Sequence, residues 1–336
     1  MDVVTEEDLE AASVLARYKV KYIVDPHIRT SAAHALQLWL LNGVGTLVST
    51  VNGALLDLLS PTPAPSNASS VLVSAFGAGF RPTSFRRAGV VNFIKRDLQF
   101  VPRLDNATVG WSSFPAAWRV VVDPEAIATD TPMVVLGEQS HMSWKPSMQV
   151  VATYSDGAAA AVLRSYPSGG AAFYLGWYPG LSYFHPAIPL RPADKGNTDA
   201  NFNHFVPTAF HAGARELLAM PALASTPDVV PVVVSEPLVE SGVIQAPGLG
   251  TAIVLVNWSP HTLLHGLTVT LAFDVPWLRS RSATLASGRS VVVSRVPHPH
   301  AGRNASLAGT EVYRCTLDMW VTETIIRRET EVRGVA

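Results

Sequence analysis

Residues 19–51 read KVKYIVDPHIRTSAAHALQLWLLNGVGTLVSTV, and this stretch decides the fold. Its first six residues mix β-branched, aromatic and basic side chains, which is typical of a strand. Thr30 or Ser31 then caps a helix with apolar residues at helical spacing, and Asn42-Gly43 ends that helix. A second strand follows at residues 46–51. The order strand, helix, strand predicts two parallel strands joined by a crossover helix.

The segment before this stretch predicts a short helix preceded by part of a strand. Asp2-Val3-Val4 has the composition of a strand. Thr5 followed by three acidic residues is typical of a helix N-terminus. We therefore predict an α/β fold with a flavodoxin-like, doubly wound sheet that is truncated at its N-terminus, since a strand and a helix would normally precede Asp2.

The segment after it is less regular. Residues 61–70, PTPAPSNASS, predict an exposed loop. Asp156-Gly157 predicts the turn of a hairpin between residues 150–154 and 159–165. Further predicted elements are strands at residues 118–122, 133–136 and 171–177, and a partly helical segment at residues 199–219 that ends before Pro221.

Valine-rich strands separated by turns begin near residue 228 and predict a small all-β sandwich. The change of character falls at Ser225-Thr226-Pro227. The predicted domains are therefore residues 1–226 and residues 227–336. The expected strands of the second domain are residues 230–234, 239–245, 252–257, 267–273, 290–296 and 311–317.

Composition and charge exclude several classes of function. The chain has 25 Lys and Arg against 26 Asp and Glu, and the basic residues form no stripe, so a nucleic-acid partner is not expected. Charged residues make up only 15% of the 336 residues, which favours a surface partly covered by a partner. Neither a signal peptide nor a membrane-spanning segment is recognisable, so we expect a cytoplasmic protein with no membrane contact.

Several segments of the chain match those of a known family. They are Leu15 to Val20, Asp25 to Ile28, Trp39, Thr46 to Val48, Ala152 to Gly157, Ala160 to Val162, Tyr174 to Phe184 and Val254 to Trp258. Through the first seven, the chain resembles the glutamine-amidotransferase-like, non-catalytic trimerisation domain that follows the catalytic barrel in one family of beta-galactosidases. The last resembles a strand of the small C-terminal sandwich in the same architecture. The chain departs from the family at Gly43-Val44-Gly45, in place of a Gly-Gly turn, and at Asp57-Leu58, in place of an acidic pair.

Catalytic machinery is not recognisable in the sequence. Amidotransferase chemistry needs a Cys on a turn after a strand, whereas the single Cys315 reads as a buried strand residue in the second domain. No Gly-x-Ser-x-Gly elbow is present. Glu138 and Asp156 are the acids at predicted strand ends, and we interpret Glu138 as solvated and Asp156 as a turn residue. We predict no catalytic residues and no cofactor.

Metal binding is not predicted either. The two histidines of the segment Pro297 to His300 fit a loose surface loop better than a metal site. The polar residues that follow residue 177 are interpreted first as a loop or a hydrogen-bond network.

A sharper hypothesis places a ligand in the same segment, because ligands of open α/β sheets bind beyond the carboxyl ends of strands. Aromatic faces beside amide, carboxylate and imidazole groups suit a sugar or a loop of another subunit. The candidate ligand-binding residues are Trp177, Tyr178, Tyr183, His185, Asp194, Asn197 and Asp199.

The function implied by the resemblance is a structural or oligomerisation region of a beta-galactosidase-like glycoside hydrolase. Its expected partner is a copy of itself or a catalytic barrel domain. One alternative is that the chain is part of an active glycoside hydrolase whose barrel it lacks. Another is a stand-alone module that binds a carbohydrate or a small molecule.

Overall fold

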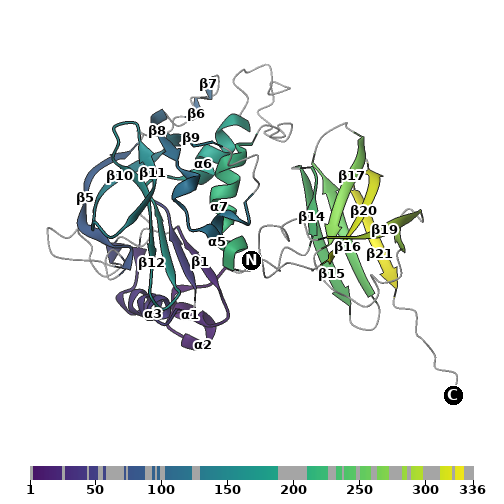
Figure 1. Cartoon of the computed structure of the whole chain (residues 1–336), viewed down its shortest axis with the longest axis horizontal. Coiled ribbons are helices and arrows are strands. Elements are labelled where there is room, and N and C mark those ends of the chain that lie inside the picture. The colour runs from purple at the N-terminus through teal and green to yellow at the C-terminus, as the bar shows by residue number, and fades with distance from the viewer. Residues whose placement is uncertain are drawn as a thin grey trace. The chain divides into compact units, whose positions relative to one another are not determined.

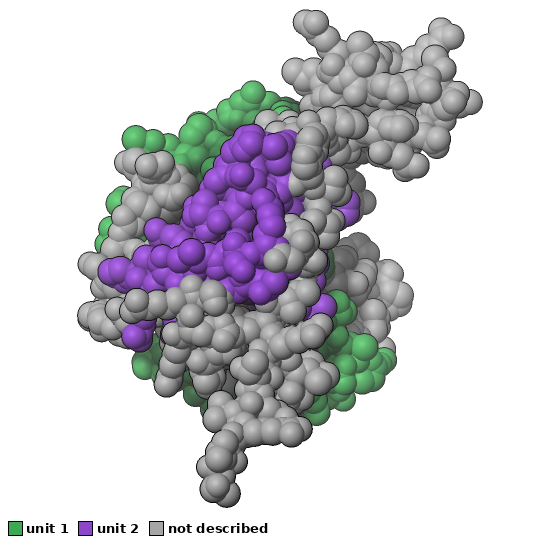
Figure 2. All heavy atoms as spheres, turned by 90° about the vertical axis from the view of Figure 1, so that its right-hand side faces the viewer, with its two compact units in different colours: residues 1–200, 209–226 green, residues 201–208, 227–336 purple. Residues whose placement is uncertain are grey.

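The computed structural model divides the chain into two compact units, residues 1–200 with 209–226 and residues 201–208 with 227–336, which are drawn in green and purple in Figure 2. The residues that the structure describes are 3–24, 27–43, 45–51, 56–57, 72, 75–87, 93–94, 97–98, 103–122, 129–187, 210–225, 232–236, 238–246, 250–258, 263–271, 282–285, 289–297, 311–319 and 322–328.

The first unit is built on a seven-stranded mixed sheet with the order β1-β3-β13-β12-β11-β8-β9 (Figure 1). Strands β1, β3 and β13 run parallel, and the remaining neighbours are antiparallel. The strands are Val20–Ile23 (β1), Thr46–Ser49 (β3), Arg103–Val109 (β8), Thr131–Leu136 (β9), Gln149–Tyr154 (β11), Ala159–Ser165 (β12) and Ala171–Leu175 (β13).

This sheet bears out the predicted α/β class and the parallel pairing of the two strands in residues 19–51. The flavodoxin-like, doubly wound arrangement is not confirmed, because only β1, β3 and β13 run parallel. The predicted hairpin at Asp156-Gly157 is confirmed as the antiparallel pair β11 and β12.

Helices cover both faces of the sheet. Those of the first unit are Glu6–Leu9 (α1), Ala12–Leu15 (α2), Thr30–Leu41 (α3), Ala116–Arg119 (α5), Pro179–Phe184 (α6) and Ala212–Ser225 (α7), with 3₁₀ turns at Trp111–Ser113 (η1) and His185–Ala187 (η2). Figure 1 shows α1, α2 and α3 grouped together and α5, α6 and α7 grouped apart from them.

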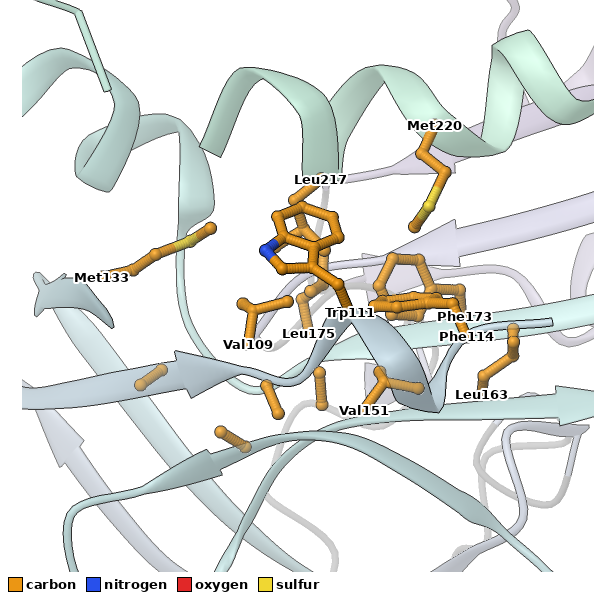
Figure 3. Close-up of a cluster of buried hydrophobic side chains, with 14 of the residues drawn as sticks. Val109, Trp111, Phe114, Met133, Val151, Leu163, Phe173, Leu175, Leu217 and Met220 are labelled. Atoms are coloured by element: carbon orange, nitrogen blue, oxygen red, sulfur yellow. The ribbon is translucent and has the colours of Figure 1, made fainter. Parts of the chain in front are cut away.

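Alternate residues of β13 enter two different cores, as expected for a strand buried on both sides. Ala172 and Tyr174 pack with residues of α3, among them Leu36, Trp39 and Leu40. Phe173 and Leu175 pack on the opposite face with aromatic and apolar residues of η1, α5 and α7. Figure 3 shows Trp111, Phe114, Phe173, Leu217 and Met220 converging in this second core.

Short two-stranded sheets flank the main sheet. Ala78–Arg87 (β5) pairs antiparallel with Glu138–Trp144 (β10), and Phe93–Ile94 (β6) with Asp97–Leu98 (β7). His27–Ile28 (β2) pairs parallel with Leu56–Asp57 (β4).

The predicted helix ends are partly confirmed. Thr5 forms a capping box with Asp8, whose backbone N–H donates to the Thr5 hydroxyl while its carboxylate accepts from the backbone of Thr5. Asn42 caps the C-terminus of α3, but the N-cap of this helix is Arg29, and Thr30 is already its first helical residue.

Three local predictions are wrong. Val3 and Val4 form no strand. Residues 116–119 form the helix α5, where a strand at 118–122 was expected, because Pro115 starts a helical turn that packs Trp118 into the core. The helix α7 continues through Pro221 to Ser225, since burial of Leu217, Met220 and Pro221 outweighs the loss of one helical hydrogen bond.

The second unit is a series of eight antiparallel strands in the order β14-β17-β20-β19-β18-β21-β16-β15. They enclose one core, to which β14, β15, β16, β17, β18, β19 and β20 all contribute. The strands are Val232–Val234 (β14), Val239–Ala246 (β15), Gly250–Asn257 (β16), Leu264–Leu271 (β17), Ser282–Leu285 (β18), Ser290–Pro297 (β19), Glu311–Met319 (β20) and Thr322–Arg328 (β21).

Cys315 lies on β20 in this core, as predicted. Burial raises the pKa of its thiol to about 11, so the thiolate needed for nucleophilic chemistry is disfavoured. Among the described residues, no helix is long and apolar enough to cross a membrane.

Candidate functional site

A polar run at the start of β10 forms the most elaborate hydrogen-bond network that the structure describes. Gly137, with a positive φ of 77°, turns the chain from β9 into β10, a conformation that glycine adopts without strain. The backbone N–H of Ser140 then donates to the carbonyl of Gly176 at 2.9 Å. This bond joins β10 to the end of β13, beside the ligand-binding segment predicted from the sequence.

One side of this strand carries Glu138 and Ser140, since alternate residues of a strand point to opposite faces. Glu138 is only 8% exposed, and its carboxylate accepts a hydrogen bond from the Tyr178 hydroxyl at 2.8 Å. The hydroxyls of Ser140 and Tyr174 lie 2.8 Å apart and share a hydrogen bond. The interpretation of Glu138 as a solvated acid is therefore wrong.

The other side carries Gln139 and His141 and meets β8 and the turn after β11. We call the five residues Asp105, Gln139, His141, Ser155 and Asp156 the Asp105 cluster. The Gln139 amide donates to Asp105 Oδ2 at 3.0 Å and contacts His141 Nε2 at 2.9 Å. The Ser155 hydroxyl also donates to Asp105. The cluster joins three segments that are distant in sequence.

The charge of Asp105 is stabilised by its partners. Burial raises the pKa of its carboxyl, but hydrogen bonds from Ser155, from the backbone N–H of Asn106 and from Gln139 together outweigh burial, so the pKa is lowered overall. The N–H of Asn106 donates to Asp105 Oδ1 at 2.7 Å. Asp105 is thus an ionised acceptor whose lone pairs already receive four donors, since the backbone N–H of Ser155 also contributes.

The His141 ring is held in one orientation. It stacks on the Tyr154 ring, with 4.7 Å between centroids and 9° between planes. Its Nε2 accepts from the Gln139 amide, because an amide nitrogen can only donate. The proton of the neutral imidazole then resides on Nδ1, which lies 3.8 Å from Asp156 Oδ2. Asp156 also serves as the predicted turn residue, since its Oδ1 accepts from the N–H of Ala158 at 2.9 Å.

Tyr154 fixes the base of the cluster. Its buried hydroxyl donates to the carbonyls of Gly176, at 2.7 Å, and Ser140, at 3.1 Å. Burial raises the pKa of this phenol, and the neighbouring Tyr174 and Asp105 raise it further. The phenol therefore stays protonated and links the ends of β10 and β13.

This arrangement suits hydrogen bonding better than covalent chemistry. The Ser155 hydroxyl donates to Asp105, whose lowered pKa makes it a weak base for activating a nucleophile. Within the described parts of the chain, no group of three or more His, Cys, Asp or Glu is placed to hold a metal ion. The exposed members Ser155 and Asp156 are the groups that a polar ligand could reach.

The structure describes four residues of the predicted ligand site: Trp177, Tyr178, Tyr183 and His185. Trp177 is completely buried, and its indole N–H donates to the Ser182 hydroxyl at 3.2 Å. Ser182 in turn donates to the carbonyl of Val134 at 2.6 Å. Trp177 is therefore placed as a core residue, whereas Tyr178 reaches Glu138 as described above.

Tyr183 and His185 follow on α6 and η2. The Tyr183 ring stacks on Phe210, with 4.6 Å between centroids, and its carbonyl accepts from the N–H of His211 at 3.0 Å. These contacts join α6 to the start of α7. His185 is partly exposed. Asp194, Asn197 and Asp199 lie outside the described residues, as do His298 and His300 of the predicted surface loop.

The sequence contained a usable signal for the Asp105 cluster. A run of four polar residues, Glu138 to His141, follows one predicted strand, and the acidic turn residue Asp156 follows another. Asp105 and Gln139 were missed, because nothing in the linear sequence indicates that β8 and β10 meet.

Comparison with known proteins gives a likeness of fold only. No protein-family profile matches the chain, and no curated protein matches it. Among solved structures, it is similar to Gan42B, a GH42 beta-galactosidase from G. stearothermophilus, with a TM-score of 0.53 and 14% sequence identity. That alignment covers 97% of this chain and 34% of Gan42B.

Two further structures agree. A catalytic mutant of Gan42B gives a TM-score of 0.52 at 13% identity, covering 93% of this chain and 32% of the mutant. A beta-galactosidase from Rahnella sp. R3 gives a TM-score of 0.50 at 13% identity, with the same coverage. The chain spans about a third of the length of these enzymes. Its fold is therefore related to a part of GH42 beta-galactosidases.

Proposed function

We propose that this chain is a non-catalytic structural and oligomerisation region of a beta-galactosidase-like glycoside hydrolase. One observation carries the proposal: a single GH42 enzyme matches 97% of the chain, and hence residues of both units, over about a third of its own length. The trimerisation domain and the C-terminal sandwich inferred from the sequence are the parts of such an enzyme that we assign to the two units.

The chemistry of the described carboxylates supports a non-catalytic role. Glycoside hydrolysis needs two carboxyl groups about 5–9 Å apart that are free to act as acid, base or nucleophile. Glu138 is buried against the Tyr178 hydroxyl, and Asp105 accepts from Ser155, Gln139 and Asn106. Both groups are engaged in holding β10 and β11 in place.

Exposed apolar side chains on the first unit support association. Leu38 and Leu41 are 60% and 48% exposed on α3, and residues three apart on a helix lie side by side. Val24, after β1, is 68% exposed. Such side chains favour contact with another protein surface. A copy of this chain or a catalytic barrel domain would cover them.

The test is the molar mass of the purified chain in solution, measured by light scattering, together with an assay on galactosides. We expect the mass of an oligomer, at least twice the 36.0 kDa of one chain, and no turnover of the galactosides. The variant Leu38→Glu/Leu41→Glu is expected to lower the mass, whereas His34→Glu adds a charge to the same helix without removing an apolar side chain. A monomer that hydrolyses a galactoside would overturn the proposal.

A second candidate is a small-molecule-binding module, which the Asp105 cluster favours. Its ordered His141 and the exposed Asp156 present a donor and an acceptor at fixed positions. Chemical-shift changes of His141 on titration with galactose, absent in the variant Gln139→Leu, are the expected sign of such binding. Unchanged shifts throughout the titration would remove this candidate.

A further inference from the structure

Trp258 is exposed although most described tryptophans are buried. Trp39, Trp111, Trp118 and Trp177 are each 9% exposed or less, whereas Trp258, directly after β16, is 57% exposed. An indole holds a large apolar area, and leaving it in water is unfavourable unless something binds it. Its position in the second unit is independent of the Asp105 cluster.

The Trp258 ring is fixed rather than loose. Its indole N–H donates to Glu240 Oε2 at 2.9 Å. Its backbone N–H donates to the carbonyl of Leu238 at 2.9 Å. A ring that is already held in place loses little conformational entropy when a ligand stacks on it. Trp258 is thus pre-organised as a flat contact surface.

The neighbouring strands extend this surface. On β15 and β16, which pair along their length, Glu240, Gly242 and Ile244 face outward, as do Val254 and Val256. Gly242 stands opposite Val254, and no atom lies within 4 Å of a Cβ placed on it. We call Glu240, Gly242, Val254, Val256 and Trp258 the Trp258 shelf. From Glu240 to Gly242 it runs about 7 Å along β15.

We propose that the Trp258 shelf binds a neutral carbohydrate. A pyranose ring has an apolar face of C–H groups, which can stack on the indole, and hydroxyls at its rim, which donate to a carboxylate. Glu240 contacts the Nε1 edge of the indole, and Trp258 is 57% exposed among the described residues, so the pyranose ring can stack on the indole while the carboxylate lies where rim hydroxyls would reach. The bare backbone at Gly242 leaves room for a second sugar unit.

The same geometry disfavours other ligands. The Glu240 carboxylate repels phosphates and other anions. A quaternary ammonium group binds best where several aromatic rings surround it, whereas the shelf offers one ring with its carboxylate at the edge. The proposal goes beyond the structural role given above, because it assigns a ligand to the second unit in addition to that role.

The test is titration of the full chain with two neutral probes, a β-1,4-linked galactose tetrasaccharide and a β-1,4-linked glucose tetrasaccharide. Binding is followed by saturation-transfer NMR and by tryptophan fluorescence. We expect at least one probe to bind. Trp258→Ala should weaken that binding by about tenfold or more, as for a central aromatic contact.

Two further variants sharpen the result. Glu240→Gln keeps an acceptor for the indole N–H but removes the charge, and should weaken binding by about three- to tenfold. Val292→Ala is the matched control, because Val292 is 75% exposed on β19 and lies outside the shelf. It should bind like the unaltered chain. Melting temperatures close to that of the unaltered chain show that each variant is folded.

Four outcomes would overturn the proposal: no binding of either probe, equal binding by Trp258→Ala, tetramethylammonium binding more tightly than the sugars, or a lower molar mass of Trp258→Ala. The last would assign the shelf to contacts between copies of the chain. The molar mass of the unaltered chain tests the structural role separately, so failure of one proposal is distinguishable from failure of the other.

Discussion

The ammonium group of Lys21 lies 3.5 Å from the centroid of the Trp39 ring. The same group donates to the carbonyl of Leu15 at 2.9 Å, and the residue is only 7% exposed. Both contacts favour the charged form. Burial nevertheless lowers the pKa of Lys21 from 10.5 to about 8, so loss of hydration outweighs them.

The buried Lys21 should make stability depend on pH. Between about pH 8 and 10.5, the unfolded chain keeps a proton that the folded chain has lost. The free energy of unfolding therefore rises with pH in this window through Lys21. We expect Lys21→Met to lack this contribution. Urea denaturation of both proteins at pH 7, 8 and 9 measures it, and parallel pH profiles would contradict the assignment.

Gly43 should tolerate no side chain. Its φ is +71°, and a Cβ there would lie 1.8 Å from the carbonyl oxygen of Ser168. Gly157 has a similar φ of +83° but open space around it. Gly157→Ala should cost about 1–2 kcal/mol for backbone strain. Gly43→Ala adds the clash and should cost about 3 kcal/mol or more. Thermal unfolding of both variants tests this, and equal losses would refute the close packing.

The Tyr154 hydroxyl should stabilise the first unit. Tyr154→Phe removes the hydrogen bonds to the carbonyls of Gly176 and Ser140, of which the Gly176 carbonyl keeps the Ser140 N–H as a donor, and this loss should cost about 1–3 kcal/mol. Tyr183→Phe is the control, because the Tyr183 ring stacks on Phe210 and its hydroxyl makes no hydrogen bond among the described residues. We expect a change within about 0.5 kcal/mol there. Denaturant unfolding measures the stability of both variants. An unchanged free energy of unfolding in Tyr154→Phe would contradict a stabilising role for the Tyr154 hydroxyl.

Asp105 should stabilise the fold only while it is ionised. Its pKa is lowered below the ordinary 3.8, so its contribution is present above pH 3.8 and is lost as the pH falls through the folded-state value. Asp105→Asn should be less stable than the unaltered chain at pH 6, and the difference should shrink on acidification. Ser155→Ala removes the hydrogen bond that does most to lower the Asp105 pKa, so it should reduce the pH dependence while leaving the carboxylate in place. A difference that is constant with pH would exclude a role for the charge.

Local chemistry made part of the fold predictable from the sequence. Asp156-Gly157 specifies a hairpin turn by its own conformational preferences, and Thr5 specifies a helix start through its hydroxyl. The extent of α7 was not predictable in the same way. Proline disfavours a helix interior, but the tertiary burial of Leu217 and Met220 decides the outcome at Pro221.

The candidate site was harder to predict, because it depends on contacts between distant segments. Tyr178 was selected from the sequence, and the structure gives it Glu138 as a partner. The Asp105 cluster could not be predicted from the sequence. It requires that the chain leave the main sheet after β9, at Gly137, and that β10 then approach β8 and the turn after β11. Hydropathy and spacing along the chain carry no information about that path.

The position of β13 in the sheet bears on how the protein is made. Strand β3 pairs with β1 along one edge and with β13 along the other. Thr46 on β3 therefore finds its second pairing partner only in Ala171, which is synthesised 125 residues later. A ribosome must therefore release most of the first unit before this hydrogen-bonding edge is closed. Such non-local pairing slows folding and leaves apolar edges open to aggregation during synthesis. Slow translation or chaperones should therefore raise the yield of soluble chain.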